Sequence, residues 1–233
     1  MRSYVSNGIR FFNDQRKVGY IFVLPSIVIF SIFVFIPLIV TILLSFFSFD
    51  LMGSNLKFIG LENYSTLLKD ERFWNSLSNT AYYTFVSVPL QIVIALLIAV
   101  AINKASTFNT ILRAVYFMPA ICSMTITAII WSFLIDNDIG IFTYYLRCLG
   151  IKTIAWLKDP VWAMPAVIAV SVWKTFGFNM VIILAGLQGI PDTYYEASEI
   201  DGAGKVKQFL YITLPMLIPT IGFVTITSVI NSF

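Results

Sequence analysis

The longest stretch of this chain without a charged residue covers residues 18–49, and it constrains the fold more than any other feature. A membrane-spanning helix needs about 20 consecutive apolar residues, so this stretch can cross a bilayer with turns to spare. It is too long for the apolar core of a signal peptide, and no small-residue cleavage site closes it. Pro25 and Pro37 predict an initial bend and a kink. We therefore expect an uncleaved first span.

Further apolar stretches predict further spans. These are residues 73–103, with their core at 81–102, residues 114–135, residues 161–187, which Lys174 interrupts, and residues 208–233. Only 12% of the residues are charged, against about 25% in a soluble domain. The short alternating segments of a membrane β-barrel are not seen in the sequence. The sequence predicts an all-α integral membrane protein with about five transmembrane helices, residues 18–233, after an N-terminal segment, residues 1–17.

The composition also excludes several classes of function. The net charge is only +3 and no basic run is present, so we expect no nucleic-acid partner. The chain has no histidine, the commonest general base and metal ligand. Cys122 and Cys148 are not a close pair, and no glycine-rich loop of the phosphate-binding type is present. We expect no catalytic residue, no metal site and no cofactor bound by this chain.

Basic residues before the first span set its predicted orientation. Arg2, Arg10, Arg16 and Lys17 all precede the apolar stretch, and cytoplasmic segments are enriched in Lys and Arg. We therefore expect a cytoplasmic N-terminus. Four crossings then return the polar segment between the fourth and fifth spans to the cytoplasmic face.

That polar segment predicts a short helix closed by a glycine turn. Thr193, with Glu196 three residues later, has the pattern of a capping box. A helix at about residues 194–201 would follow it. Gly202 is expected to end this helix, because glycine readily adopts the positive φ of a helix C-terminus.

A second short helix is expected after the turn. It would cover about residues 205–213 and lead to Pro215 in the first turn of the fifth span. Judged by its local pattern alone, the whole segment is an ordinary interfacial loop in which Glu196 only caps a helix.

The spacing within the segment nevertheless resembles a family signature. Its residues are Glu196, Ala197, Ser198, Gly202, Ile212, Leu214 and Pro215. This is the spacing of the Glu-Ala-Ala motif in permease subunits of binding-protein-dependent ABC importers, with Ser198 in place of the second alanine. The match lies where the predicted topology requires a cytoplasmic loop, so the family interpretation outweighs the ordinary loop.

Other parts of the chain resemble the carbohydrate-uptake branch of the same family. They are "FIGLENY" at residues 58–64, "NTAYYTF" at residues 79–85 and "LAGLQGIPDTYYEASEIDGAG" at residues 184–204. The chain is similar to the maltose-type first permease subunit but shorter. Members of the family normally have six spans, so we expect a permease domain that is truncated at its C-terminus.

The resemblance implies a mechanism. The polar segment would be a helix-turn-helix coupling loop that docks in a cleft of a cytoplasmic ATPase subunit. ATP binding would move this loop, and the spans would rock between inward- and outward-open states around a solute site near mid-membrane. The residues implied to contact the ATPase subunit are Glu196, Ala197, Ser198, Asp201, Gly202 and Ala203.

The resemblance also implies partners and a location. The chain would act with a second permease subunit, an ATP-binding cassette ATPase dimer that binds ATP and Mg, and an extracytoplasmic solute-binding protein. It would lie in the lipid of a bacterial inner membrane. The solute would be carbohydrate-like: a sugar, an oligosaccharide, a polyol or a glycerol phosphate.

Polar side chains within the spans are candidates for the substrate path. A charge at membrane depth is a functional hypothesis by default, which singles out Lys174. Its alternative role is pairing with a partner subunit or a backbone carbonyl. Aromatic faces stack on sugar rings and amides bond hydroxyls, which adds Trp173, Asn179, Tyr82, Tyr83 and Asn79, with Gln91 offering the same chemistry. For each of these, helix packing or interface anchoring is the competing interpretation.

Two rival functions stay open at this point. A secondary transporter driven by an ion gradient would carry inverted repeats and charged residues inside several spans, whereas only Lys174 is such a residue here. A non-functional permease remnant is the second rival.

Overall fold

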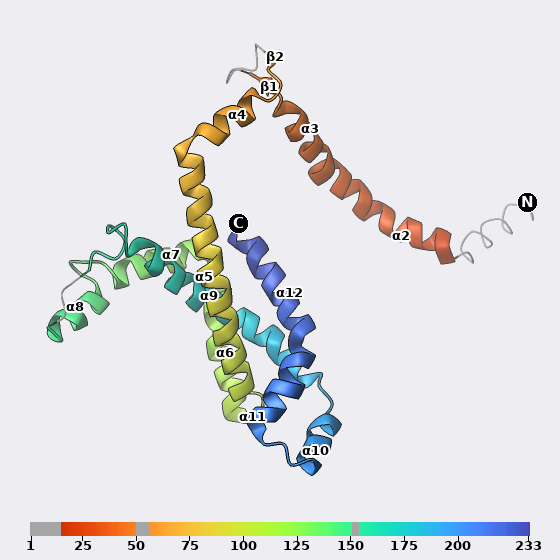
Figure 1. Cartoon of the computed structure of the whole chain (residues 1–233), viewed down its shortest axis with the longest axis vertical. Helices are drawn as coiled ribbons and strands as arrows, with labels where there is room; N and C mark the ends of the chain where they lie inside the picture. The colour runs from red at the N-terminus through yellow and green to blue at the C-terminus, as the bar shows by residue number, and fades with distance from the viewer. Residues whose placement is uncertain (1–14, 50–55, 151–153) are drawn as a thin grey trace, which may run out of the picture. The chain divides into compact units, whose positions relative to one another are not determined.

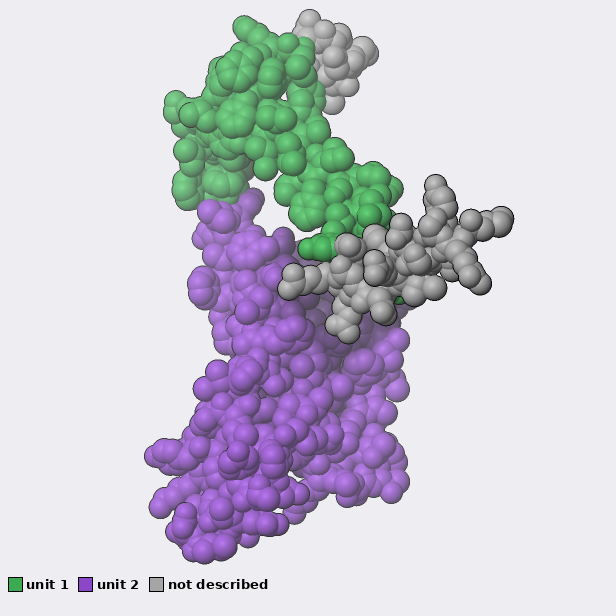
Figure 2. All heavy atoms as spheres, turned by 90° about the vertical axis from the view of Figure 1, so that its right-hand side faces the viewer, with its two compact units in different colours: residues 1–75 green, residues 76–233 purple. Residues whose placement is uncertain are grey.

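The computed structural model describes residues 15–49, 56–150 and 154–233, and helices make up most of these residues (Figure 1). Residues 1–14 lie outside the described part, so the cytoplasmic N-terminal segment stays a prediction. The chain divides into two compact units, Met1–Asn75 and Ser76–Phe233, which Figure 2 colours separately. Each unit is described in turn.

The first unit is a long helix followed by a small hairpin and a short helix. Its elements are α2 (Gln15–Phe30), the π-helical segment η1 (Ser31–Phe35), α3 (Ile36–Leu44), β1 (Phe47–Ser48), β2 (Lys57–Phe58), α4 (Glu62–Lys69) and the start of α5 (Glu71–Ala101). The two strands pair antiparallel. The part Gly19–Leu44 is long and apolar enough to cross a membrane, and none of its side chains is buried. A helix that is apolar on every side requires an apolar environment, as expected for a first span.

Both π-helical segments lie directly before a proline. η1 ends two residues before Pro37 and contains Phe33, and the segment η2 (Phe209–Thr213) likewise precedes Pro215. A proline ring clashes with the carbonyl four residues earlier and offers no N–H to it. The wider π turn takes up this clash, so the helix continues past each proline. Pro25 lies inside α2 and does not mark its start.

The "FIGLENY" motif closes the hairpin onto the end of α3. The Asn63 side-chain amide donates to the backbone oxygens of Ser45, at 2.8 Å, and Phe47, at 3.1 Å. The hydroxyl of Tyr64 lies 2.6 Å from the Ser45 hydroxyl. Gly60 has a φ of +60°, which glycine adopts without strain. The motif therefore has a structural role at the end of the first span.

The second unit is a bundle around α9 (Figure 1). Its elements are the rest of α5, α6 (Thr107–Ile121), α7 (Met124–Leu134), α8 (Ile141–Cys148), α9 (Ala163–Gln188), α10 (Asp192–Ile200), α11 (Lys205–Gln208), η2 and α12 (Leu214–Ser232). α9 packs against both α6 and α12. The buried core includes Ala95, Ala99, Met180, Ile183, Leu187, Leu217 and Val224. Small alanines on α5 let its backbone approach the other helices closely.

The predicted second, fourth and fifth spans are confirmed as helices of sufficient length. They correspond to Glu71–Ala101, Ala163–Gln188 and Lys205–Ser232. The fifth begins earlier than predicted, because α11 and η2 continue into α12 without a break. Pro215 therefore lies inside this helix, and the expected separate helix at residues 205–213 is wrong.

The predicted third span, residues 114–135, is not one straight helix. α6 and α7 are separated by Cys122 and Ser123 and bend by 97°. Both residues have extended backbone, with ψ angles of 143° and 141°, so helical hydrogen bonding stops there. Pro119 in the last turn of α6 removes one more backbone donor, which weakens that end of the helix.

The polar segment forms a helix, a turn and a second helical start, but without the predicted capping box. α10 begins at Asp192 after Pro191, and no side chain caps its N-terminus. Thr193 and Glu196 both lie inside the helix. The extended backbone of Pro191 and the acidic Asp192 in the positive first turn favour the earlier start. Gly202 has a φ of +74°, which confirms its role in ending α10.

Candidate functional site

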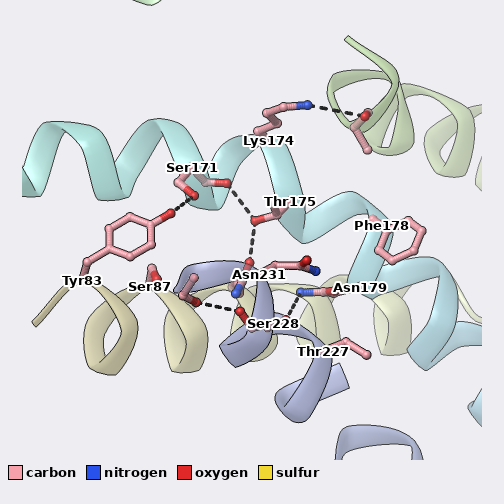
Figure 3. A pocket seen from close by; sticks show the side chains of 13 residues that line it. Tyr83, Ser87, Ser171, Lys174, Thr175, Phe178, Asn179, Thr227, Ser228 and Asn231 are labelled. Atoms are coloured by element: carbon pink, nitrogen blue, oxygen red, sulfur yellow. Dashed lines mark hydrogen bonds between the residues drawn. The ribbon is translucent and has the colours of Figure 1, made fainter. Parts of the chain in front are cut away.

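A cavity of about 220 Å³ lies in the second unit, among α5, α9 and α12 (Figure 3). Most of its polar lining comes from side chains spaced four residues apart, which places them on one face of each helix. They are Tyr83, Ser87 and Gln91 on α5, Ser171, Thr175 and Asn179 on α9, and Ser228 and Ser232 on α12. Ser87, Gln91, Asn179, Ser171 and Ser228 are buried. Three otherwise apolar helices thus each present a row of polar side chains, called a polar stripe below, to the same cavity.

The stripes are joined by hydrogen bonds between helices. The hydroxyl of Tyr83 bonds that of Ser171, and the amide of Asn179 donates to the Ser228 hydroxyl at 3.3 Å. The Thr175 hydroxyl lies 2.5 Å from the side-chain oxygen of Gln91 and 2.8 Å from the backbone oxygen of Ser171. One hydroxyl proton serves only one of these acceptors at a time, so the cavity retains capacity for a hydroxyl donor.

The charge of the cavity is confined to its edge. Among the described residues that line it, only Lys174 has a charged side chain. The Lys174 ammonium donates to the backbone oxygen of Cys122 at 2.7 Å and lies 3.5 Å from that of Ala120. Figure 3 shows it directed toward the end of α6 and away from the Thr175 and Asn179 side chains. The rest of the lining is neutral and suits a ligand that is rich in hydroxyl groups.

The structure brings together half of the predicted substrate-path residues. Lys174, Asn179 and Tyr83 line the cavity, as does Gln91. Trp173, Tyr82 and Asn79 do not.

Trp173 instead packs edge-on against Trp131 of α7, with 5.3 Å between ring centroids. Tyr82 and Asn79 are exposed side chains on α5. The sequence reasoning missed Ser87, Ser171 and Ser228, although the four-residue spacing of polar residues in an apolar helix was a signal for them.

The predicted coupling residues lie on α10 and in the turn after it. Glu196, Ala197, Asp201 and Gly202 are exposed, whereas Ser198 and Ala203 are half-buried. Asp192 and Glu199 are also exposed, so α10 presents a mainly acidic surface. Ile200 adds an apolar side chain that is 87% exposed. Such a combination suits contact with a basic, partly apolar surface.

Side chains attach α10 to the base of the fifth helix. The Gln208 amide donates to the Ser198 hydroxyl at 2.9 Å, and the Tyr195 hydroxyl lies 2.9 Å from that of Thr213. Tyr195 also packs against the buried core. Ser198 therefore faces inward to α11, and it is the exposed neighbours that are available to a partner.

Gly177 allows α9 to approach α6 closely beside the cavity. A Cβ atom on Gly177 would lie 1.9 Å from the backbone oxygen of Tyr116, so α9 and α6 touch backbone to backbone there. Lys174 and Trp173 lie about one turn away on α9. This contact fixes the position of α9 against the broken third span.

Two known permease proteins are similar to this chain over most of its length. The probable ABC transporter permease protein YesP of Bacillus subtilis (strain 168) is 39% identical over 96% of this chain and 72% of its own length. The lactose transport system permease protein LacF of Rhizobium radiobacter is 36% identical over 92% of this chain and 72% of its own length.

A solved structure gives the same result. A bacterial ABC transporter involved in the import of the acidic polysaccharide alginate contains a chain that superposes with a TM-score of 0.76 at 26% identity. The match covers 94% of this chain and 75% of that chain. The model of the family described as "binding-protein-dependent transport system inner membrane component" matches residues 64–233, which confirms the resemblance found in the sequence. This chain therefore belongs to that family of inner-membrane transport components.

Proposed function

We propose that this chain is the permease subunit of an ATP-driven importer and that its solute is carbohydrate-like. The observation that carries this proposal is the cavity with its neutral lining of hydroxyl and amide groups. Such groups exchange hydrogen bonds readily with a sugar, an oligosaccharide or a polyol. A glycerol phosphate would need its charge matched as well. Relatives named for lactose and alginate transport support the carbohydrate class.

The second part of the proposal concerns force transmission. The exposed acidic surface of α10 would dock on an ATPase subunit through Glu196, Ala197, Asp201 and Gly202. α10 follows α9 through Pro191 and is bonded to the base of α12 by Ser198 and Tyr195. Both α9 and α12 line the cavity. Movement of α10 would therefore reach two of the three walls of the solute site through short, bonded connections.

The partners follow from this role. We infer a second permease subunit, an ATPase dimer that binds ATP and Mg, and an extracytoplasmic solute-binding protein. A related alginate importer has been crystallised with its substrate-bound periplasmic protein, which supports the last of these. The N-terminus and the α10 segment would face the cytoplasm. This chain itself would carry neither ATP nor a metal.

The ion-coupled alternative has little support in the spans. Among the described residues of the four uninterrupted candidate spans, charged side chains lie near helix ends, with Lys174 as the exception. The lysine is engaged with backbone carbonyls. No carboxylate in the described spans is placed to carry a proton or sodium ion through the membrane, as an ion-coupled carrier requires.

The solute class is tested by transport. A solute-binding protein that stimulates the assembled transporter would be screened against sugars, polyols and glycerol phosphates, and its ligand would then be used for uptake into proteoliposomes with the partner subunits. Gln91→Leu should raise the KM for uptake about tenfold, because a lost hydrogen bond to a buried polar group costs roughly 1–3 kcal/mol. Tyr82→Phe, on the exposed face of α5, is the control. An equal effect of both variants, or a ligand without hydroxyl groups, would contradict the proposal.

Coupling is tested at the glycine turn. Gly202→Val forces a branched side chain into a positive φ, which is strongly disfavoured. Gly204→Val is the matched control, because Gly204 has φ and ψ of −73° and 165°. Nothing lies within 4 Å of a Cβ at either position. The first variant should lose ATPase stimulation by the binding protein while the second retains it. Normal stimulation in Gly202→Val would refute the coupling role.

A further inference from the structure

The break in the third span leaves backbone carbonyls without helical partners. α6 ends at Ile121, and Cys122 and Ser123 are extended before α7 begins. The last carbonyls of any helix lack intrahelical donors. In a membrane each unsatisfied carbonyl costs several kcal/mol, so such a break needs donors from elsewhere.

Lys174 provides these donors from a distant part of the chain. Its ammonium lies 2.7 Å from the Cys122 oxygen and 3.5 Å from the Ala120 oxygen. A positive charge at this position also faces the negative end of the α6 dipole. The contact is held in place by Gly177, whose missing side chain lets α9 touch α6.

The residue before Lys174 contacts the other side of the break. Trp173 packs edge-on against Trp131 of α7, and the Trp131 ring stacks on Phe142 of α8, with centroids 5.8 Å apart. Two consecutive residues of α9 therefore contact α6 on one side of the break and α7 on the other.

We propose that Trp173 and Lys174 are positioning residues that set the angle between α6 and α7. Lys174 secures the end of α6 by charge-assisted hydrogen bonds, and Trp173 secures α7 by ring packing. The broken span then follows α9 as one body during transport. This assigns Lys174 a role in conformational change and not in solute recognition.

The angle can be measured with spin labels on both sides of the break. Cys122 and Cys148 are replaced by serine, and labels are placed through Phe108→Cys on α6 and Phe133→Cys on α7, both exposed positions. A second pair, Phe108→Cys with Met118→Cys, lies on α6 alone and serves as control.

Lys174→Met should broaden the distance distribution of the first pair and leave the control pair unchanged. Lys174→Arg, which keeps charged donors, should restore a narrow distribution. The proposal would be overturned if Lys174→Met left the distance distribution of the first pair unchanged. It would also be overturned if the distribution in Lys174→Arg were as broad as in Lys174→Met. Trp173→Leu tests the α7 side in the same way. It should broaden the distance distribution of the first pair, and it is the decisive variant if the Lys174→Met protein does not accumulate in the membrane.

Transport kinetics separate positioning from recognition. Lys174→Met should lower the maximal uptake rate about tenfold or more, the effect of losing a charge-assisted hydrogen bond, with little change in KM. Lys174→Arg should recover most of the rate. A rise in KM at an unchanged maximal rate would place Lys174 in the solute site and refute the positioning role. The label distances do not depend on the identity of the solute, so they test this inference even if the carbohydrate proposal fails.

Discussion

A single methyl group at Gly177 should separate α9 from α6. The Cβ of an alanine there would lie 1.9 Å from the Tyr116 oxygen and 2.8 Å from its carbonyl carbon. Even close contacts between carbon and oxygen in proteins have separations of about 3.3 Å or more. The two backbones must therefore move apart by about 1.4 Å on this basis. Because the position of Cβ is fixed by the α9 backbone and the Tyr116 atoms belong to the α6 backbone, no side-chain rotation can relieve the overlap.

The size of the destabilisation can be estimated from this overlap. Overpacking of this kind costs about 1–3 kcal/mol, and the rigidity of a backbone contact favours the upper part of that range. Replacing glycine by alanine within a helix raises the free energy of unfolding by up to about 1 kcal/mol, which offsets part of this cost. The same displacement weakens the Lys174 hydrogen bond one turn away. We expect a net loss of about 2 kcal/mol in the free energy of unfolding, or roughly 4–8 °C in melting temperature for a chain of this size.

Gly222→Ala is the matched control. Gly222 lies within α12, and nothing is within 4 Å of a Cβ placed on it. Its alanine variant should be as stable as the parent or slightly more so. Both variants are heated in detergent, and the fraction that stays monodisperse is measured by size-exclusion chromatography. Equal melting temperatures for Gly177→Ala and Gly222→Ala would refute the close contact between α9 and α6.

Three further perturbations test other parts of the molecule. Asn63→Ala removes the donor to the Ser45 and Phe47 backbone, so hydrogen exchange at the β1–β2 hairpin should accelerate, with α4 as internal reference. Backbone N–H groups of Asp138 and Ile139 lower the pKa of Asp136 below its ordinary 3.8. The ionised Asp136 carboxylate therefore stabilises the fold at pH values above 3.8, and this stabilisation is lost as the pH falls through the lowered pKa. Hydrogen-exchange protection of the Asp138 and Ile139 amides should therefore drop in acid in the parent but not in Asp136→Ala. In Asn179→Cys with Ser228→Cys, a short bifunctional reagent that joins the two cysteines should abolish the uptake measured before its addition if α9 and α12 separate at the cavity, whereas the same reagent should not change the uptake of either single-cysteine variant.

The spans could be predicted because membrane crossing is a local property of the sequence. A charge-free stretch of sufficient length has few alternatives to a helix in a bilayer. The glycine turn at Gly202 was likewise predictable, since the positive φ belongs to the residue itself. The starting residues of α10 and of the fifth helix could not be predicted. The capping-box pattern at Thr193 competed with Pro191 and Asp192, and the π turn before Pro215 let the helix continue where a proline suggested a boundary.

The break in the third span could not be predicted, because its cause lies elsewhere in the chain. Residues 114–135 carry no charge, and Pro119 alone does not distinguish a kinked helix from a broken one. The donors that satisfy the exposed carbonyls come from Lys174, in the next span. Only the fold brings that side chain to Cys122, so a local pattern carries no sign of the bend.

The candidate site was predicted in part, for a reason that helical geometry explains. Tyr82 and Tyr83 are chemically equal candidates in the sequence, but only Tyr83 lies four and eight residues before Ser87 and Gln91. Lys174 was identified by its charge, and Asn179 by its amide. The serines gave no such chemical signal and are recognisable only as members of stripes.

If the cavity is the proposed solute site, the stripes also locate the barrier to transport. Each changes from polar to apolar toward α10. They run Tyr83, Ser87, Gln91, Ala95 and Ala99 on α5, Ser171, Thr175, Asn179, Ile183 and Leu187 on α9, and Ser232, Ser228 and Val224 on α12. The apolar members belong to the buried core, which lies between the cavity and α10. A hydroxylated solute passing that way requires these helices to part. Because α10 is joined to α9 through Pro191 and to α12 through Gln208 and Thr213, force applied at α10 in the proposed mechanism would act directly on this core.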